Sequence, residues 1–429
     1  MIQSKFKFDT LQIHAGSQPD PATGARQTPI YQNTAYVFKD AAHAASLYNL
    51  QEVGYIYSRL TNPTVSVLQE RVATLEGGIG GIACSSGHAA QILALFPLMQ
   101  PGDNIIASNR LYGGSINQLE NMIRKFGWSA KFSDFENLKQ LESLVDENTK
   151  AIFCESISNP GGYVTDIPAV SAKAKKFGIP LIVDNTAATP FLFRPFEHGA
   201  DIVTHSTTKY LSGNGTSMGG LVIDHGTFNW SESNKFPSLT QPEKGYHGLK
   251  FHETFGYLGY TLYGIAVSLR DLGMSMAPQN AFQTLLGIET LSLRMSKHVS
   301  NAESLASWLE NDDRVGEVHY AGLDSSPYAS RVKSLYPKGA GALFTFTIKG
   351  GYEPCVRFVN SVEIFSHVSN LGDSRSLVIH PASTTHRQLS EEHQKSAGAG
   401  PNIIRLSVGI EDATDLINDL DQALTLAVA

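Results

Sequence analysis

Between residues 63 and 265, short apolar runs alternate with stretches of helical periodicity. The runs 104–107, 151–154, 179–184 and 200–205 are rich in Ile, Val and Ala, and helical segments separate them. Such alternation is typical of α/β domains, in which helices cover both faces of a mostly parallel sheet. The carboxyl ends of parallel strands meet at one edge, so we expect the residues that follow these runs to lie together.

Two of the runs end in residues of complementary chemistry. One ends in Asp184, and the next leads through the hydroxyl-rich segment Ser206-Thr-Thr208 to Lys209. Hydroxyls and backbone N–H groups can hold a phosphate, and a lysine amine can form a Schiff base with a carbonyl compound. A lysine with an acidic partner for a pyridinium nitrogen is the arrangement of pyridoxal phosphate (PLP) chemistry. Each residue alone would also fit a surface lysine or a helix cap, but together they predict PLP.

Other polar or flexible residues also follow predicted strands. Gly87 lies at a strand-to-helix turn, where backbone N–H groups can face an anion. Tyr112 opens a helix and could stack on a flat ring, and Asn159 follows another strand. For Tyr112, packing in the core is the alternative interpretation.

The chain divides into three predicted parts. Residues 1–62 form an irregular arm that cannot bury a core alone and must lie on its own domain or on a neighbouring subunit. Residues 63–267 form the PLP-binding α/β domain, and residues 268–429 a C-terminal α+β domain. We expect 227–263 to be a long loop that shapes the substrate entrance, because loops of this length are usually functional or disordered.

Composition excludes several partners. The net charge is −7, from 33 basic and 40 acidic residues without a sustained basic run, so neither nucleic acid nor an anionic membrane is an expected partner. Three cysteines give no disulfide framework and favour a reducing compartment. The most apolar segment, 89–99, is too short to span a bilayer, and no signal peptide is evident. We expect a soluble, cytoplasmic protein.

Seven motifs occur in order along nearly the whole chain. With them the sequence resembles the Cys/Met metabolism (trans-sulfuration) family of PLP-dependent enzymes. This resemblance implies the type I fold of PLP enzymes and a homotetramer built from two dimers with shared active sites. The motifs are Tyr57-Ser-Arg59-Leu-Thr-Asn-Pro-Thr, Ser86-Gly87-His88-Ala-Ala, Leu111-Tyr112-Gly-Gly, Glu155-Ser-Ile-Ser-Asn159-Pro, Val183-Asp184-Asn-Thr, Ser206-Thr-Thr-Lys209-Tyr and Arg405-Leu-Ser-Val-Gly-Ile-Glu.

The resemblance also implies roles for individual residues. Tyr57 and Arg59 would reach the phosphate of the neighbouring subunit, and Tyr57 would also contact the substrate and assist catalysis. Arg405, assisted by Ser376, would bind the substrate carboxylate. The remaining residues would serve the cofactor, three of them with a catalytic part as well: Lys209 (covalent attachment, catalytic), Asp184 (ring nitrogen, catalytic), Tyr112 (ring stacking, catalytic), Asn159 (ring oxygen), and Ser206, Thr208 and the backbone at Gly87 and His88 (phosphate). His88 stands where the family often has Met.

Further segments suggest which reaction the family resemblance implies. The segments 213–217, 236–256, 270–273 and 371–386 are similar to the corresponding segments of family members that act on O-acetyl-L-homoserine. These members carry out γ-replacement with sulfide or a thiol, which gives homocysteine or methionine plus acetate. Cystathionine γ-synthase, O-succinylhomoserine sulfhydrylase and methionine γ-lyase activities are the alternatives. The lyases usually have Cys where this chain has Gly114.

Other classes of protein fit the sequence less well. A nicotinamide-dependent oxidoreductase would need a third fingerprint glycine, but Ala83 stands in its place. A non-catalytic assembly protein would not need a lysine after three hydroxyl residues. A metal hydrolase is poorly supported, because the 14 histidines include no His-Glu-x-x-His. We expect no metal site and interpret His380 and His386 as loop residues.

Overall fold

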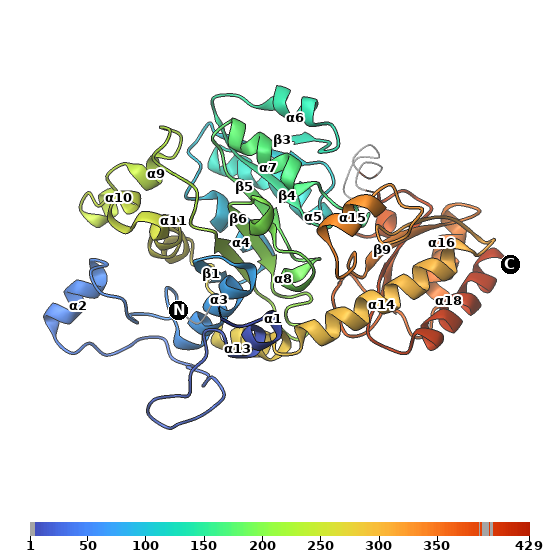
Figure 1. Ribbon diagram of the computed structural model, residues 1–429, viewed down its shortest axis with the longest axis horizontal. Helices are drawn as coiled ribbons and strands as arrows, with labels where there is room; N and C mark the ends of the chain where they lie inside the picture. Colours follow the sequence, from blue (N-terminus) through green and yellow to red (C-terminus); the bar gives the residue numbers. More distant parts are fainter. Residues whose placement is uncertain (1–4, 386, 388–393, 395–397) are drawn as a thin grey trace.

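The chain folds into two lobes, each built around its own sheet (Figure 1). The structure is a computed structural model that describes residues 5–385, 387, 394 and 398–429. Over these residues, the larger lobe has a seven-stranded sheet in the order β1 (Gly80–Cys84), β7 (Gly220–Asp224), β6 (Ile202–Ser206), β5 (Leu181–Asp184), β4 (Thr149–Glu155), β2 (Asn104–Ser108), β3 (Ser129–Ser133). The smaller lobe has a five-stranded sheet in the order β10 (Ser366–His367), β11 (Leu377–Ile379), β12 (Ile403–Ser407), β9 (Leu343–Ile348), β8 (Val315–His319).

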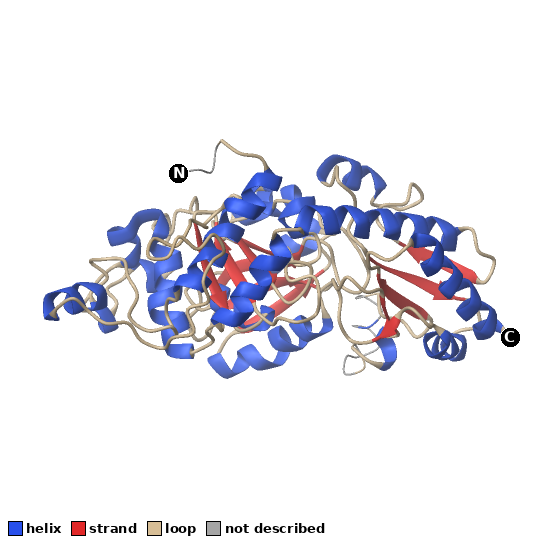
Figure 2. Ribbon diagram, turned by 90° about the horizontal axis from the view of Figure 1, so that it is seen from below, coloured by secondary structure: helices blue, strands red, loops and turns tan. Residues whose placement is uncertain are grey.

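The larger sheet is mostly parallel, which confirms the predicted fold class. Only β7 runs antiparallel to its neighbours β1 and β6. Helices lie on both sides of its strands (Figure 2). Because both faces are covered, successive residues of one strand enter different cores: Leu181 and Val183 pack into one, and Ile182 into the other.

Several helices of the larger lobe begin at side-chain caps. Ser86 Oγ accepts from the N–H of Ala89 at 3.1 Å, so α4 starts two residues earlier than its apolar run suggests. Asp166 caps α7 in the same way, and Pro168 stands in its first turn. The helices up to the end of this lobe are α1 (Phe8–His14), α2 (Ala41–Tyr48), α3 (Pro63–Glu76), α4 (Gly87–Leu95), α5 (Gly113–Asn117), α6 (Leu138–Leu144), α7 (Ile167–Lys176), α8 (Thr189–Leu192), α9 (Pro237–Thr240), α10 (Phe251–Phe255), α11 (Gly259–Tyr263), α12 (Arg270–Leu272) and α13 (Pro278–Ile288).

The helix after Tyr112 is interrupted by one wide turn. From α5 the chain continues through a π-helical turn, Gln118–Met122, and a 3₁₀ turn, Ile123–Phe126. The N–H of Ile123 bonds to the carbonyl of Gln118, five residues back, as in a π-helix. The sequence indicated a helix that opens at Tyr112 but not this turn.

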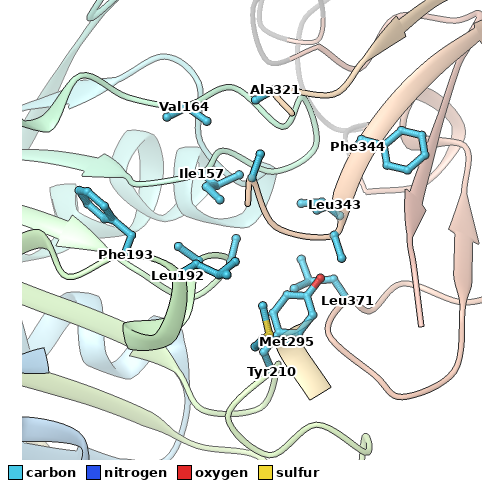
Figure 3. Close-up of a cluster of buried hydrophobic side chains, with 14 of the residues drawn as sticks. Ile157, Val164, Leu192, Phe193, Tyr210, Met295, Ala321, Leu343, Phe344 and Leu371 are labelled. Atoms are coloured by element: carbon cyan, nitrogen blue, oxygen red, sulfur yellow. The ribbon is translucent and has the colours of Figure 1, made fainter. Parts of the chain in front are cut away.

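A long helix and an apolar cluster connect the lobes. Helix α14 (Leu291–Glu310) extends from the larger lobe along the smaller one (Figure 1). Between them, Ile157 from the larger lobe and Met295 of α14 belong to the same buried core as Leu343 and Leu371 of the smaller lobe (Figure 3). The other helices of the smaller lobe are α15 (Ala329–Leu335), α16 (Tyr352–Ser361) and α18 (Ala413–Val428).

The expectation of a long entrance loop at 227–263 is wrong. This segment contains α9, α10 and α11 and packs into a core through Trp230, Phe236, Phe251 and Tyr260. None of its residues lines the cavity described below. Aromatic residues spaced between glycines and prolines therefore marked short buried helices, not an open loop.

The arm lies partly on its own chain. Helix α1, which the sequence did not indicate, packs on α3, and its Gln12 side chain bonds to Ser292 of α14. Beyond it the chain extends away from the body around α2 (Figure 1). There Val37 and Val53 are 98% and 99% exposed.

Candidate active site

A cavity of about 280 Å³ opens at the carboxyl ends of β4, β5 and β6, where the two lobes meet. The larger lobe supplies residues at or near the ends of its strands, and the smaller lobe supplies residues 369–371, Thr385 and Arg405 of β12. The predicted site residues that line it are Gly87, His88, Tyr112, Asn159, Asp184, Ser206, Thr208, Lys209 and Arg405.

Lys209 lies inside this cavity, and the pKa of its amine is lowered. Its Nζ donates to Asn370 Oδ1 at 2.5 Å. Burial, and to a lesser extent the positive charge of Arg405, lower the pKa of Lys209 from 10.5 to about 8. A lysine with such a pKa has a much larger neutral fraction near neutral pH, which is the form that attacks a carbonyl carbon.

Asp184 is held in one orientation by its neighbours. The side chain is 8% exposed; Oδ1 accepts from the N–H of Thr186 at 3.0 Å, and Oδ2 from the hydroxyl of Thr204 at 3.1 Å. A buried carboxylate fixed in this way can hold a protonated ring nitrogen without first having to reorient.

Arg405 provides a buried cation whose hydrogen-bond donors are not all used. It is 2% exposed; it donates to Asn159 Oδ1 at 3.0 Å and to the carbonyl of Asn370 at 2.6 Å. Its Nε has no hydrogen-bond partner among the described residues. Burial lowers the pKa of Arg405 to about 10, so the side chain remains charged at neutral pH. A charged, incompletely paired guanidinium in a cavity is suited to a carboxylate ligand.

The start of α4 forms a close-fitting turn against β6. A Cβ atom at Gly87 would lie 2.7 Å from Cβ of Ser206, so only glycine fits there. The first N–H groups of α4, at Gly87 and His88, have no partner within the helix and lie beside the Ser206 side chain. Free N–H groups at the positive end of a helix, next to hydroxyls, are the usual cradle of a phosphate.

The rings of Tyr112 and His88 pack against each other in an edge-to-face contact. Their ring centroids lie 6.0 Å apart with the planes at 87°. A Cβ atom at Gly114 would come within 2.5 Å of Tyr112 Cε1 and 3.0 Å of His88 Cε1. The two rings thus occupy the space that a side chain at position 114 would need.

The family to which the chain belongs follows from these residues and from comparison with known proteins. The family described as Cys/Met metabolism PLP-dependent enzyme matches residues 9–425. The chain belongs to this family. It is 45% identical over 428 residues to O-acetyl-L-homoserine sulfhydrylase of Leptospira meyeri, covering 98% of this chain and 97% of that protein.

Solved structures of the family share the fold. A protein from Campylobacter jejuni described as an O-acetylhomoserine (thiol)-lyase, which contains N′-pyridoxyl-lysine-5′-monophosphate, matches with a TM-score of 0.95 and 43% identity over 98% of this chain and all of that one. Cystathionine γ-synthase of Xanthomonas oryzae matches with a TM-score of 0.85 and 31% identity over 99% of each chain. The expected type I fold of PLP enzymes is thereby confirmed.

As a member of this family the chain is a PLP-dependent enzyme, and its cavity fits that cofactor. The glycine-only turn at the start of α4 suits a phosphate, the fixed carboxylate of Asp184 suits a ring nitrogen, and the low pKa of Lys209 suits covalent attachment. These three features lie in one cavity.

Three predicted site residues lie elsewhere. Ser376 does not line the cavity: its hydroxyl donates to Glu411 Oε2 at 2.9 Å and accepts from the N–H of Gly409 at 2.8 Å. The prediction that Ser376 assists Arg405 is therefore corrected, because the hydroxyl of Ser376 is bonded to Glu411 and Gly409 and does not reach the cavity. Tyr57 and Arg59 also lie outside the cavity of their own chain; the Arg59 guanidinium lies 5.4 Å from the Tyr57 ring centroid and donates to the carbonyl of Arg270.

The sequence missed several residues that line the cavity. Asn370 contacts both Lys209 and Arg405, yet it lies in irregular chain where no periodicity marks it. The neighbouring Leu371-Gly-Asp segment, already noted for its resemblance, was the available signal. The other missed residues are Ser86, Gln91, Ser115, Glu155, Ile157, Thr186, Ala187, Met218, Ser369, Leu371 and Thr385.

Within the described part of the chain, no group of three or more His, Cys, Asp and Glu side chains could hold a metal ion, and no helix has the length and apolarity needed to cross a membrane. His380 bonds to the carbonyl of Pro401 at 2.9 Å, while His386 lies outside the described residues.

Proposed function

We propose that the chain catalyses γ-replacement on O-acetyl-L-homoserine, with sulfide or a thiol as acceptor, to give homocysteine or methionine plus acetate. The observation that carries this proposal is the presence of Lys209, Asp184 and Arg405 in one cavity. Near end-to-end similarity to an O-acetyl-L-homoserine sulfhydrylase supports the choice of substrate.

Each of these residues has a role in this proposal. When bound, PLP withdraws electrons from the α-carbon of an amino acid. Lys209 holds the cofactor covalently and, when free, moves protons at Cα and Cβ, which allows acetate to leave from Cγ. Asp184 keeps the ring nitrogen protonated, and Arg405 binds the substrate carboxylate through two N–H groups.

The remaining site residues position the cofactor. Tyr112 stacks on the ring and Asn159 contacts its oxygen. The phosphate contacts are Ser206, Thr208 and the backbone at Gly87 and His88. Spectroscopy tests the central assignment: the purified protein should absorb visible light through bound PLP, and Lys209→Ala should lose this absorption. An unchanged spectrum in the variant would contradict it.

The choice of reaction is tested by substrate competition. We expect release of homocysteine from O-acetyl-L-homoserine plus sulfide at a much higher kcat/KM than from the succinyl ester, and slow breakdown of methionine. Gly114 supports this expectation, since the space that a lyase cysteine would need is filled by the rings of Tyr112 and His88. Faster turnover with O-succinylhomoserine plus cysteine would favour cystathionine γ-synthase instead, and rapid methionine cleavage would favour the lyase.

We further propose a homotetramer made of two dimers, in which the arm completes the neighbour's site. The arm supports this, because beyond α1 it extends away from the body of its own chain around α2, and a segment without a core of its own suits packing on a neighbouring subunit. Tyr57 and Arg59 would then contact the partner's phosphate, and Tyr57 its substrate.

Complementation tests the shared site. Arg59→Ala and Lys209→Ala should each be inactive, but co-expression with two tags should restore part of the activity, because one site of a mixed dimer receives both intact halves. Tagged heterodimers that remain as inactive as their parents would show that the arm serves its own subunit.

The domain boundaries at 62/63 and 267/268 also remain part of this proposal. So does a cytoplasmic location, which the three free and buried cysteines support.

A further inference from the structure

One cavity residue has no role in the proposed reaction although its placement is costly. Glu155 is the last residue of β4, is 7% exposed and lies opposite Asp184 in the parallel pairing of β4 with β5. Burial, and then the charge of Asp184, raise the pKa of Glu155 to about 8. A carboxyl group in such surroundings is unfavourable unless specific contacts require it.

The contacts of Glu155 join two segments of the site. Oε1 accepts from the N–H of Tyr112 at 2.8 Å, and Oε2 accepts from the N–H of Asn159 at 2.9 Å. Tyr112 stands directly before α5, and Asn159 lies in the irregular chain after β4. Neither backbone position belongs to a regular ladder, so the single carboxyl group fixes both.

We propose that Glu155 is a positioning residue that sets Tyr112 and Asn159 relative to each other, and so relative to the cofactor that both would contact. The inference rests on the proposed function in so far as Tyr112 stacks on the ring and Asn159 contacts its oxygen. Glu155 acts through these residues and does not itself take part in the reaction.

The requirement for two acceptors explains why a carboxyl group is needed. Each of its oxygens can accept one N–H whether the group is ionised or protonated, whereas the amide of glutamine has one accepting oxygen and an NH₂ group that only donates. In Glu155→Gln, one of the two backbone N–H groups would face another donor and lose its bond. Glu155→Asp keeps both acceptors, but its side chain is shorter by one methylene.

A matched control is available in the same sheet. Asp201 is 8% exposed, accepts from the N–H of Leu181 at 2.9 Å, and has a pKa raised to about 6 by burial. It lies just before β6, at the edge of the sheet opposite the cavity, and does not line it. Asp201→Asn therefore removes a buried carboxyl group without touching Tyr112 or Asn159.

The test measures cofactor geometry separately from stability. For wild type, Glu155→Gln, Glu155→Asp and Asp201→Asn, we would determine the affinity of the apo-protein for PLP, the visible circular dichroism of bound PLP, the melting temperature of the apo-protein, and kcat and KM. In Glu155→Gln we expect roughly tenfold weaker PLP binding and reduced visible dichroism, corresponding to loss of one buried hydrogen bond. The kcat should fall more than KM rises.

The controls separate positioning from folding. Asp201→Asn should keep wild-type affinity and dichroism even if its melting temperature falls, and Glu155→Asp should recover part of the dichroism. Wild-type affinity and dichroism in Glu155→Gln would overturn the inference, and so would equal losses of both in Asp201→Asn. If Glu155→Gln does not fold, Glu155→Asp decides by the same comparison. Wild-type protein that binds PLP but does not turn over O-acetyl-L-homoserine would refute the proposed function without affecting this result.

Discussion

The low pKa of Lys209 predicts how the apo-protein takes up its cofactor. Because the pKa is about 8 instead of 10.5, roughly one Lys209 amine in ten is neutral at pH 7, against about one in three thousand for an exposed lysine. PLP should therefore attach roughly 300-fold faster at pH 7 than it would to an unperturbed amine in the same position. The rate should rise with pH with a midpoint near pH 8 and level off above about pH 9.

Stopped-flow absorbance of apo-protein mixed with PLP would measure this profile, with a free lysine derivative run in parallel to correct for titration of PLP itself. Arg405→Gln should move the midpoint to higher pH, because Arg405 contributes to lowering the pKa of Lys209. Arg375→Gln is the control, since that arginine is paired with Asp373 at 2.9 Å. A rate that keeps rising through pH 10 in the wild type would refute the reasoning.

Three further outcomes are expected. Asp184→Asn should retain PLP but lose roughly a thousandfold in kcat, because a neutral amide does not hold the ring nitrogen protonated; near wild-type turnover would make Asp184 a structural cap. Gly114→Ala should weaken PLP binding, measured by titration of the apo-protein, since the new Cβ would lie 2.5 Å from Tyr112 Cε1; unaltered binding would contradict this. His205→Ala should destabilise the fold by about 3 kcal/mol or more in urea unfolding, because it leaves the fully buried Glu76 carboxyl without its 2.6 Å partner; an unchanged midpoint would show that the pair contributes nothing.

The sequence was most informative where periodicity and chemistry coincide. Strands β5 and β6 are short apolar runs that end in Asp184 and lead to Lys209, so both their structure and their meeting at one edge were predictable. The edge strands β3 and β8 were missed, because partial exposure gives them mixed composition: β3 reads Ser-Ala-Lys-Phe-Ser. Helix α1 is too short for its periodicity to stand out.

Long-range contacts explain the rest of the difference. Asn370 joins the site only because the smaller lobe packs against the larger one, and nothing near it in the sequence indicates the contact with Lys209. The role of Ser376 was inferred from the family resemblance alone, and the side chain that it meets, Glu411, lies 35 positions away. The proposed roles of Tyr57 and Arg59 depend on contact with a second copy of the chain, and periodicity within one chain carries no signal of such a contact.

The π-helical turn at Gln118–Met122 is one place near the site where the chain could lose a residue without disturbing the helical segments on either side. Such a turn accommodates one residue more than an α-helix does, while the helical segments on either side keep their facing. We expect a chain that lacks one residue in this turn to continue as a regular α-helix, with Tyr112 and the aromatic contact of Phe126 with Trp128 retained at its two ends. The same deletion in β2 would turn the buried side chains beyond it to the opposite face of the sheet. We therefore expect loss of one residue to change the fold less in the helix next to the cavity than in the strand before it.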